Sequence, residues 1–179
     1  MQAPNTTEAP PSLSRRPWLR WGLFWIIAAA VLALDQLTKE LVRSLMDRGE
    51  IWPSEDWPVR LHYVTNTGAA FGILQNQTGF LIVTTFIGLA AIYFYYRYPP
   101  FDHFVVPVSV GMMLGGALGN LLDRVRLGRV TDFIDFPSWP AFNVADSSIF
   151  IGIAALLLTY ALLSPRPARA EHEDAGADG

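Results

Sequence analysis

Three aspartates near the C-terminal end of the chain have the residue type and spacing for acid–base chemistry. Asp132 and Asp135 lie in the segment VTDFID, and Asp146 lies in FNVADS, directly before an apolar run that starts at Ile149. A charged side chain at the mouth of an apolar helix is energetically costly, so its presence favours a functional role. We therefore expect Asp132 and Asp146 to face each other at a membrane surface.

Two facing carboxylates have a defined chemistry. Close carboxylates do not readily ionise together, so the pair shares a proton. The ionised member accepts a proton from water while the protonated member donates to a carbonyl oxygen, and this combination hydrolyses a peptide bond without a covalent intermediate. The two titrations are coupled, so the assignment of acid and base belongs to the pair.

A structural interpretation of the same residues remains open. Asn143 is a favourable helix N-cap, and an acid three residues later, here Asp146, suits the first turn of a helix through the helix dipole. Asp132 is equally compatible with an ordinary strand or loop. From residue types and spacing, the site of two aspartates is a hypothesis.

Competing chemistries have little support in the composition. The chain has no cysteine, which excludes a thiol nucleophile, a disulfide framework and a cysteine-based metal site. The three histidines are isolated from one another, and Lys39 is the only lysine, so neither a serine–histidine nor a serine–lysine arrangement competes. We expect no metal and no other cofactor. Because the net charge is −3 and there is no basic block, nucleic acid is not an expected partner.

The elements that must position these aspartates are predicted to be membrane spans. The chain has 179 residues, of which 51% are hydrophobic and 16% are charged, whereas about a quarter of the residues in a soluble domain are charged. The apolar residues are clumped, and long apolar runs predict helices that cross a bilayer. The predicted spans are residues 17–46, 79–96, 104–122 and 144–163.

The spans are expected to form one membrane domain. It would cover residues 18–163, between tails at residues 1–17 and 164–179 whose polar composition indicates disorder. An alternative for the first apolar run is a cleaved signal peptide, but the helical pattern continues beyond residue 34 without turn residues.

An even number of spans puts both termini on the same side. A basic cluster of Arg15, Arg16 and Arg20 precedes the first span and favours cytoplasmic termini, so the aspartates would lie at the outer face. Between the first two spans, alternating residue types over residues 59–64 predict a short strand. We expect residues 47–58, which contain two tryptophans, to lie at the headgroup level as a mobile lid beside the site.

Other polar groups have positions from which they can support the aspartates. Asp35 and Lys39 are four residues apart at the end of the first span, which is compatible with a surface ion pair or with an organising role near the site. The segment NTGAAFG, which contains Asn66 and Gly68, favours a turn. Its amides are also suitable donors to the backbone of an extended substrate.

Glycines recur at four-residue steps in the third span, at positions 111, 115 and 119. Such spacing lets helix backbones approach closely. Helix packing does not account for Asn120 and Arg124, which share a face near the end of the span. An ion pair with a neighbouring aspartate is one explanation for Arg124.

Five motifs of the chain together resemble those of the bacterial lipoprotein signal peptidases, also called signal peptidase II. The motifs are DQLTK at residues 35–39, NTGAAFG at 66–72, GGALGNLLDR at 115–124, VTDFID at 130–135 and FNVADS at 142–147. They occur in the order of the family, with the predicted spans between them, and the resemblance covers residues 18–163. The catalytic positions show no departure from the family pattern.

The resemblance implies a fold and an activity. The fold would be a membrane all-α core of four transmembrane helices with a small extracytoplasmic β-sheet and an interfacial helix. The activity would be that of an aspartic endopeptidase of the bacterial cytoplasmic membrane. It would remove the signal peptide from diacylglyceryl-modified prolipoproteins by cutting before the lipidated cysteine. Prolipoproteins and membrane lipids would be its partners, and the cyclic peptide globomycin its inhibitor.

The resemblance also implies roles for single residues. Asp132 and Asp146 match the catalytic pair of the family. The other matching positions surround the substrate and the pair or supply supporting charge, and they are Asp35, Lys39, Asn66, Gly68, Asn120, Arg124 and Asn143.

Two other functional classes stay open from the residues alone. One is a small transporter or channel subunit with a proton path through Asp35, Asp123 and Asp146, although four spans without an evident repeat argue against it. The other is a noncatalytic membrane scaffold held together by its glycine faces.

Overall fold

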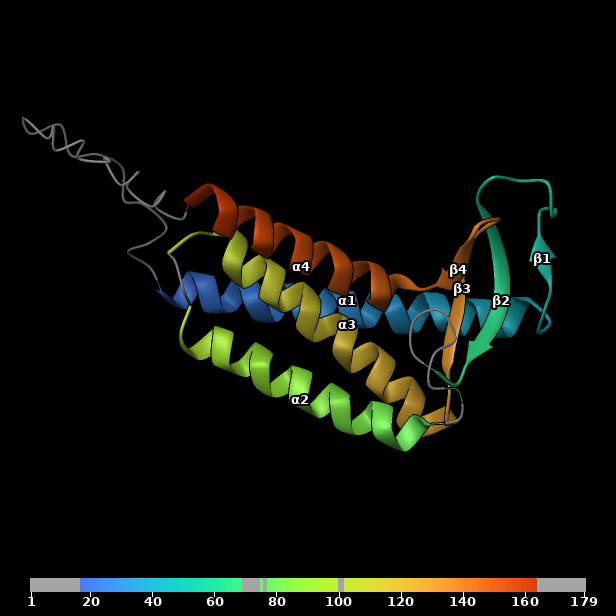
Figure 1. Cartoon of the computed structure of the whole chain (residues 1–179), viewed down its shortest axis with the longest axis horizontal. Helices are drawn as coiled ribbons and strands as arrows, with labels where there is room; N and C mark the ends of the chain where they lie inside the picture. Colours follow the sequence, from blue (N-terminus) through green and yellow to red (C-terminus); the bar gives the residue numbers. More distant parts are fainter. Residues whose placement is uncertain (1–16, 69–74, 76, 100–101, 164–179) are drawn as a thin grey trace, which may run out of the picture.

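The computed structural model describes residues 17–68, 75, 77–99 and 102–163 (Figure 1). Among these residues, four helices dominate, and they are α1 (Pro17–Leu45), α2 (Thr78–Arg97), α3 (Val105–Leu127) and α4 (Val144–Leu163). Each is long and apolar enough to cross a membrane, which confirms the four predicted spans. The third span continues beyond residue 122, because the charged residues at its end remain helical.

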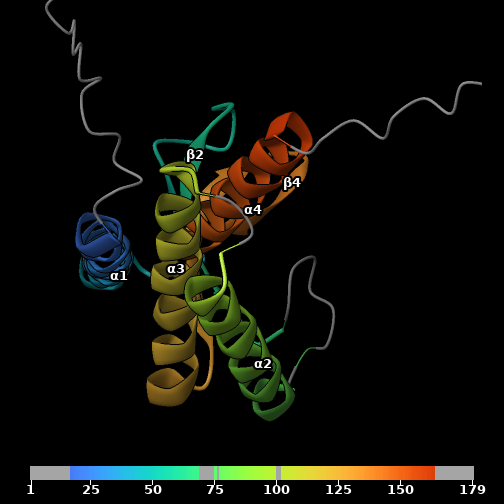
Figure 2. The same cartoon turned by 90° about the vertical axis from the view of Figure 1, so that its left-hand side faces the viewer.

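α3 is the central helix of the bundle, with α1, α2 and α4 packed around it (Figure 2). Glycines permit this packing. A Cβ atom at Gly115 would collide with the backbone carbonyl of Ala28 in α1, and a Cβ atom at Gly116 would collide with that of Ala145 in α4. Close helix packing therefore explains the repeated glycines, as their spacing predicts.

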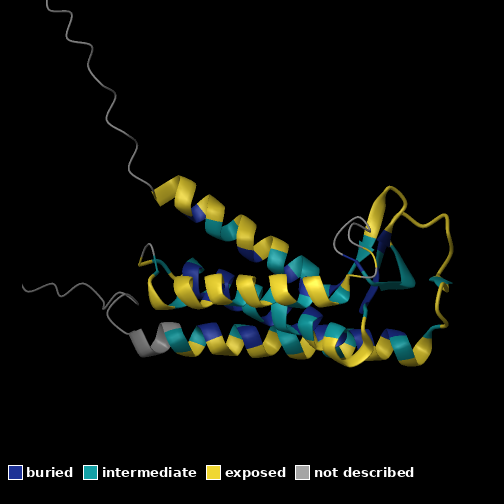
Figure 3. Ribbon diagram, turned by 60° about the horizontal axis from the view of Figure 1, so that its bottom comes forward, coloured by how far each residue is buried: buried dark blue, intermediate teal, exposed yellow. Residues whose placement is uncertain are grey.

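The helices bury one side and expose apolar residues on the other (Figure 3). Large exposed apolar surfaces are typical of contact with a membrane. On the buried side, Phe24 and Ala28 of α1 are 2% and 4% exposed, and Phe24 belongs to a core cluster with Ile92, Val106 and Val110. α1 is thus part of the folded core, which argues against a cleaved signal peptide.

A four-stranded antiparallel sheet lies at the end of the bundle where α3 ends and α4 begins (Figure 1). Its strands, in spatial and sequence order, are β1 (Ile51–Trp52), β2 (Arg60–Asn66), β3 (Val130–Phe136) and β4 (Trp139–Phe142). Gly128 ends α3 in the left-handed conformation, with a φ of 71°, and so turns the chain into β3. The sheet thereby carries Asp132 close to the first turn of α4.

α1 is long enough to extend beyond the membrane toward this sheet. Its 29 residues rise about 43 Å, whereas the hydrocarbon core is about 30 Å thick. The C-terminal turns of α1, which carry Asp35, Lys39 and Arg43, therefore reach the level of the site.

One expected strand has a different end in the structure, and other expectations concern segments that the structure does not describe or test. The strand expected at residues 59–64 is β2, which continues to Asn66, so Asn66 ends a strand and the turn follows it. Residues 69–72 of the NTGAAFG motif and the tails at 1–16 and 164–179 lie outside the described residues. The small sheet is confirmed, whereas no described residue belongs to an interfacial helix, which stays a prediction.

Candidate active site

Asp132 and Asp146 come from two elements that meet at the sheet end of the bundle. Asp132 lies on β3, and Asp146 lies in the first turn of α4. Asn143, the residue before α4, contacts both carboxylates. Its Nδ2 donates to Asp132 Oδ1 at 2.6 Å, and its backbone N–H donates to Asp146 Oδ2 at 3.4 Å. One asparagine therefore joins the two aspartates that the sequence singles out.

Asn143 is also the N-cap of α4, as the structural interpretation proposes. Its Oδ1 accepts a hydrogen bond from the Asp146 N–H at 2.9 Å, and the bond in the other direction makes the cap reciprocal. The capping role and the site are not alternatives. The cap fixes Asn143 Oδ1 and so turns Nδ2 toward Asp132.

Two further asparagines lie beside the aspartates. Asn120 on α3 donates from Nδ2 to Asp146 Oδ1 at 2.7 Å. Asn66, at the end of β2, is close enough to Asp132 for its side chain to lower the pKa of that carboxyl group. The sheet register explains the second contact, because Val64 lies opposite Asp132 and Asn66, two residues later, projects from the same face.

The carboxyl group of Asp132 has an unusual protonation behaviour. The residue is 3% exposed, and burial raises the pKa of Asp132 to about 7, with repulsion from Asp146 as the second cause. The side chains of Asn66 and Asn143 and the charge of Lys39 oppose this rise. A carboxyl group with this pKa holds a proton up to neutral pH, which is the condition for a pair that shares one proton.

A buried ion cluster lies behind the aspartates. Lys39 Nζ is 2.9 Å from Asp35 Oδ2 and 3.4 Å from Asp123 Oδ2, and the side chains of Lys39 and Asp35 are 0% exposed. The interpretation of Asp35 and Lys39 as a surface ion pair is therefore wrong, because the C-terminal turns of α1 pack against α3 and α4. Lys39 also donates to Asn120 Oδ1 at 2.9 Å, and Asp35 Oδ1 accepts from the Ala145 N–H at 2.9 Å.

The residue patterns of the sequence do not single out Arg43 or Thr131, and they give Asp123 no role in the site. Asp123 Oδ2 accepts from the Thr131 N–H at 3.0 Å, one residue before Asp132. Arg43 Nη1 donates to Thr131 Oγ1 at 2.9 Å and lies 3.6 Å from Asp123 Oδ1. Helical spacing is the signal that identifies Arg43, because it follows Lys39 by four residues on the same face of α1.

Gly68 and Arg124 meet beside the aspartates. The Gly68 N–H donates to Asn66 Oδ1 at 2.8 Å, and the Gly68 carbonyl accepts from Arg124 Nη2 at 3.4 Å. Gly68 is thus connected both to an asparagine of the site and to the end of α3. Arg124 is also within electrostatic range of Asp146 and Asp132.

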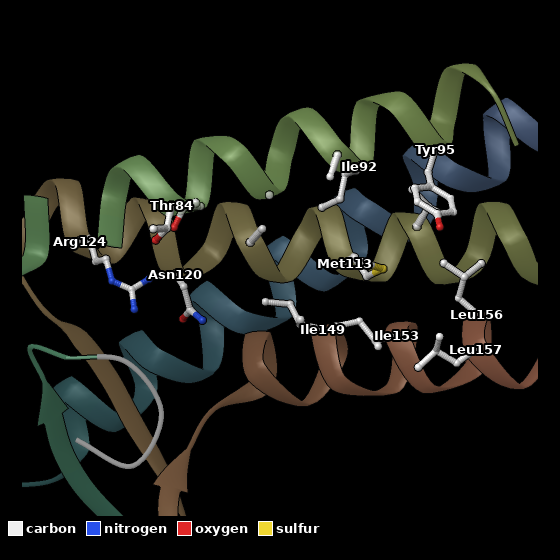
Figure 4. Close-up of a pocket in the computed structure, with 15 residues that line it drawn as sticks. Thr84, Ile92, Tyr95, Met113, Asn120, Arg124, Ile149, Ile153, Leu156 and Leu157 are labelled. Carbon is white, nitrogen blue, oxygen red and sulfur yellow. The ribbon is translucent and has the colours of Figure 1, made fainter. Parts of the chain in front are cut away.

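A cavity of about 510 Å³ runs between α2, α3 and α4 and reaches Asn120 and Arg124 at one end (Figure 4). Most of its lining is apolar and includes Ile92, Met113 and Ile149. The cavity therefore connects an apolar region between the helices to the polar groups around Asp146. Its chemistry suits a ligand with a long apolar part and a polar end.

Asp135 has partners of its own. Arg60, its neighbour across β2 and β3, donates from Nε to Asp135 Oδ2, and His62 Nδ1 lies 3.7 Å from the same oxygen. These contacts join the two strands.

Among the described residues, no group of three or more His, Cys, Asp or Glu side chains is arranged to hold a metal ion.

Known proteins are similar to this chain over most of its length. Residues 27–162 match the family described as Signal peptidase (SPase) II. The lipoprotein signal peptidase of Moorella thermoacetica is 43% identical over 142 residues, which are 79% of this chain and 93% of the relative. That of Syntrophotalea carbinolica is 44% identical over 146 residues, which are 78% of this chain and 91% of the relative.

A solved structure supports the same assignment. A bacterial membrane enzyme superimposes with a TM-score of 0.73 at 31% identity, over 83% of this chain and 95% of that enzyme. Residues 27–162, which match the family, contain the sheet and the residues of the site. The chain therefore belongs to the signal peptidase II family.

Proposed function

We propose that Asp132 and Asp146 are the catalytic pair with which this membrane peptidase acts. As a member of its family, the chain removes signal peptides from prolipoproteins. One observation supports the assignment of the pair: Asn143 contacts both carboxylates, Asn120 donates to Asp146, and the side chain of Asn66 interacts with Asp132. A helix cap or an ordinary ion pair would not require three asparagine side chains around two aspartates.

In the proposed reaction, the ionised member of the pair takes a proton from water as the water oxygen attacks the scissile carbonyl carbon. The protonated member donates to the carbonyl oxygen, which gives a tetrahedral diol. When the diol collapses, the carbon–nitrogen bond breaks, one hydroxyl proton returns to the pair, and the pair protonates the leaving nitrogen. The pair ends with one proton, as it began. The raised pKa of Asp132 supports a shared proton near neutral pH.

The cavity between α2, α3 and α4 is the proposed substrate site. A diacylglyceryl-modified prolipoprotein would lie with its apolar part against the helices and its scissile bond near Asn120 and Arg124, before the lipidated cysteine. Access from the surrounding lipid suits a substrate that is itself anchored in the membrane. Globomycin, a cyclic peptide that inhibits the resembled family, would compete for the polar end of this cavity.

The proposed location is the bacterial cytoplasmic membrane, with cytoplasmic termini and the aspartates at the outer face. α1 begins and α4 ends at the end of the bundle away from the sheet, which supports termini on the same side of the membrane (Figure 1). The basic cluster before α1 favours the cytoplasm for that side. Trp52 and Trp57 are exposed near the sheet. They suit the headgroup layer, where residues 47–58 would act as a lid.

Cleavage of a defined substrate tests the proposed function. Purified protein in lipid bilayers is incubated with a diacylglyceryl-modified prolipoprotein, and the products are identified by mass spectrometry. The expected cut lies directly before the lipidated cysteine and is suppressed by globomycin. The same prolipoprotein without the diacylglyceryl group is the control, and it should remain uncut. A cut at another position, or no cut at all, would contradict the proposal.

A further inference from the structure

The asparagines around the aspartates have fixed amide orientations. An amide oxygen only accepts hydrogen bonds and an amide NH2 only donates them, so a donor bound to the oxygen determines where the NH2 points. The oxygen of Asn143 is held at 2.9 Å by the Asp146 N–H, and that of Asn66 is held at 2.8 Å by the Gly68 N–H. In both cases a backbone N–H holds the oxygen. The NH2 of Asn143 donates to Asp132 Oδ1, and the side chain of Asn66 interacts with the same carboxyl group.

Asn120 is held by a side chain instead. Its Oδ1 accepts from Nζ of Lys39 at 2.9 Å, and its NH2 donates to Asp146 Oδ1 at 2.7 Å. Asn143 Nδ2, at 3.3 Å from Asn120 Oδ1, favours the same orientation. If the amide turned over, its NH2 would face an ammonium group that has no acceptor, and its oxygen would face a carboxylate.

The ammonium group of Lys39 has an acceptor for each of its N–H groups. Its three N–H groups match three acceptors, which are Asp35 Oδ2 at 2.9 Å, Asp123 Oδ2 at 3.4 Å and Asn120 Oδ1 at 2.9 Å. The side chain is 0% exposed, so the group is enclosed by its partners. Lys39 is therefore suited to hold Asn120 and is not placed to exchange protons with a substrate.

We infer that Lys39 is a positioning residue that acts on Asp146 through Asn120, by keeping the Asn120 NH2 group directed at the Asp146 carboxylate. The inference rests on the proposed catalytic role of Asp146. It accounts for a lysine in a fully buried cluster, where apolar residues of similar volume would avoid the cost of burying charge. The two amide donors are thus held differently: a backbone N–H orients the Asn143 amide that donates to Asp132, and a lysine orients the Asn120 amide that donates to Asp146.

A double-mutant cycle on kcat tests this inference. Lys39→Met keeps most of the length of the side chain and removes its donors, and Asn120→Leu removes the amide. Each single variant is expected to lower kcat about 10- to 100-fold, the effect of losing one hydrogen bond to a charged group, with a much smaller change in KM. If Lys39 acts through Asn120, the double variant loses no more than Asn120→Leu alone. Losses that multiply, or a wild-type kcat for Lys39→Met, would overturn the inference.

Matched variants separate this role from a general effect on folding. Thr38→Val, on the same helix, removes a hydroxyl that bonds only to its own helix backbone, and its kcat is expected to match the wild type. If Lys39→Met alone does not fold, the cycle is measured in an Asp35→Asn background. There the loss of one buried carboxylate offsets the loss of the ammonium, and the amide oxygen can still accept from Ala145.

Failure of the inference is distinguishable from failure of the proposed function. If Asp146 is not catalytic, Asp146→Asn cleaves at the wild-type rate and the proposed function falls. If only the inference is wrong, Asp146→Asn is inactive while the losses of Lys39→Met and Asn120→Leu multiply.

Discussion

Asp35 accepts a hydrogen bond from the backbone N–H of Ala145 at 2.9 Å, across 110 residues of sequence. The contact puts the carboxylate of one helix at the N-terminus of another, where free N–H groups and the helix dipole favour negative charge. The second oxygen of Asp35 lies 2.9 Å from Lys39 Nζ. One buried side chain therefore holds both the helix that carries Asp146 and the lysine that orients Asn120.

Asp35→Leu is expected to reduce both stability and cleavage more than Asp35→Asn. Leucine removes the acceptor for Ala145 and leaves Lys39 short of a carboxylate, and breaking a buried ion pair costs about 3–5 kcal/mol. Asparagine keeps the acceptor and loses only the charge. Thermal unfolding in detergent and initial cleavage rates measure the two effects. Glu40→Gln is the control, since Glu40 is 69% exposed on the same helix. Equal losses for the two Asp35 variants would contradict a capping role.

The activity should depend on pH in a defined direction. Burial raises the pKa of Asp132 to about 7, so the pair holds its shared proton below that pH and loses it above. We therefore expect kcat/KM to fall as the pH rises through about 7. The measurement is a pH profile of initial rates. A rate that is constant from about pH 6 to about pH 9 would contradict a proton shared through Asp132.

The pH dependence of folding stability gives a second measure of the protonation of Asp132, and this measure does not depend on turnover. Because the pKa of Asp132 is higher in the folded protein than its ordinary value of 3.8, its stabilising contribution is full at low pH and is lost as the pH rises to about 7. Asp132→Asn has no carboxyl group to ionise at this position, so the variant does not lose this stability as the pH rises. Its Tm relative to the wild type should therefore increase between about pH 5 and about pH 8.

Gly116→Ala should impair the site through helix packing. The added methyl group would collide with the Ala145 carbonyl and with Ile149 of α4, and overpacking costs about 1–3 kcal/mol. The start of α4 would move away from α3, which separates Asp146 from Asn120. A lower Tm and a lower kcat are expected. Gly79→Ala is the matched control, because a Cβ atom there meets nothing within 4 Å. Equal behaviour of the two variants would argue against packing as the constraint.

The orientation of the chain in the membrane is open to a direct test. With cytoplasmic termini, a reporter fused after Gly179 should be active only if it functions in the cytoplasm. A fusion between residues 53 and 58, next to the sheet, should show the opposite behaviour. A C-terminal reporter that works only outside the cytoplasm would reverse the proposed topology.

Much of the molecule follows from its sequence because the decisive residues lie in local patterns. The apolar runs predict the four helices, the glycine spacing predicts the packing of α3, and Asn143 with Asp146 predicts a helix cap. The ion cluster does not follow, because it depends on which faces of α1 and α3 meet. Asp35 and Lys39 have the spacing of a surface pair, and only the tertiary contacts make them buried. Thr131 interacts with Asp123 and Arg43 through contacts that no short motif encodes.

The measurement that tests the central claim most directly is the kcat of Asp132→Asn and Asp146→Asn on a diacylglyceryl-modified prolipoprotein. Asp135→Asn is the matched control, since Asp135 lies on the same strand as Asp132 and pairs with Arg60. Each substitution in the proposed pair should lower kcat by about 10²- to 10⁴-fold or more while the protein stays folded, because the pair loses its acid or its base. Asp135→Asn should retain most of the activity. Near-normal turnover by either Asp132→Asn or Asp146→Asn would contradict the assignment of the catalytic pair.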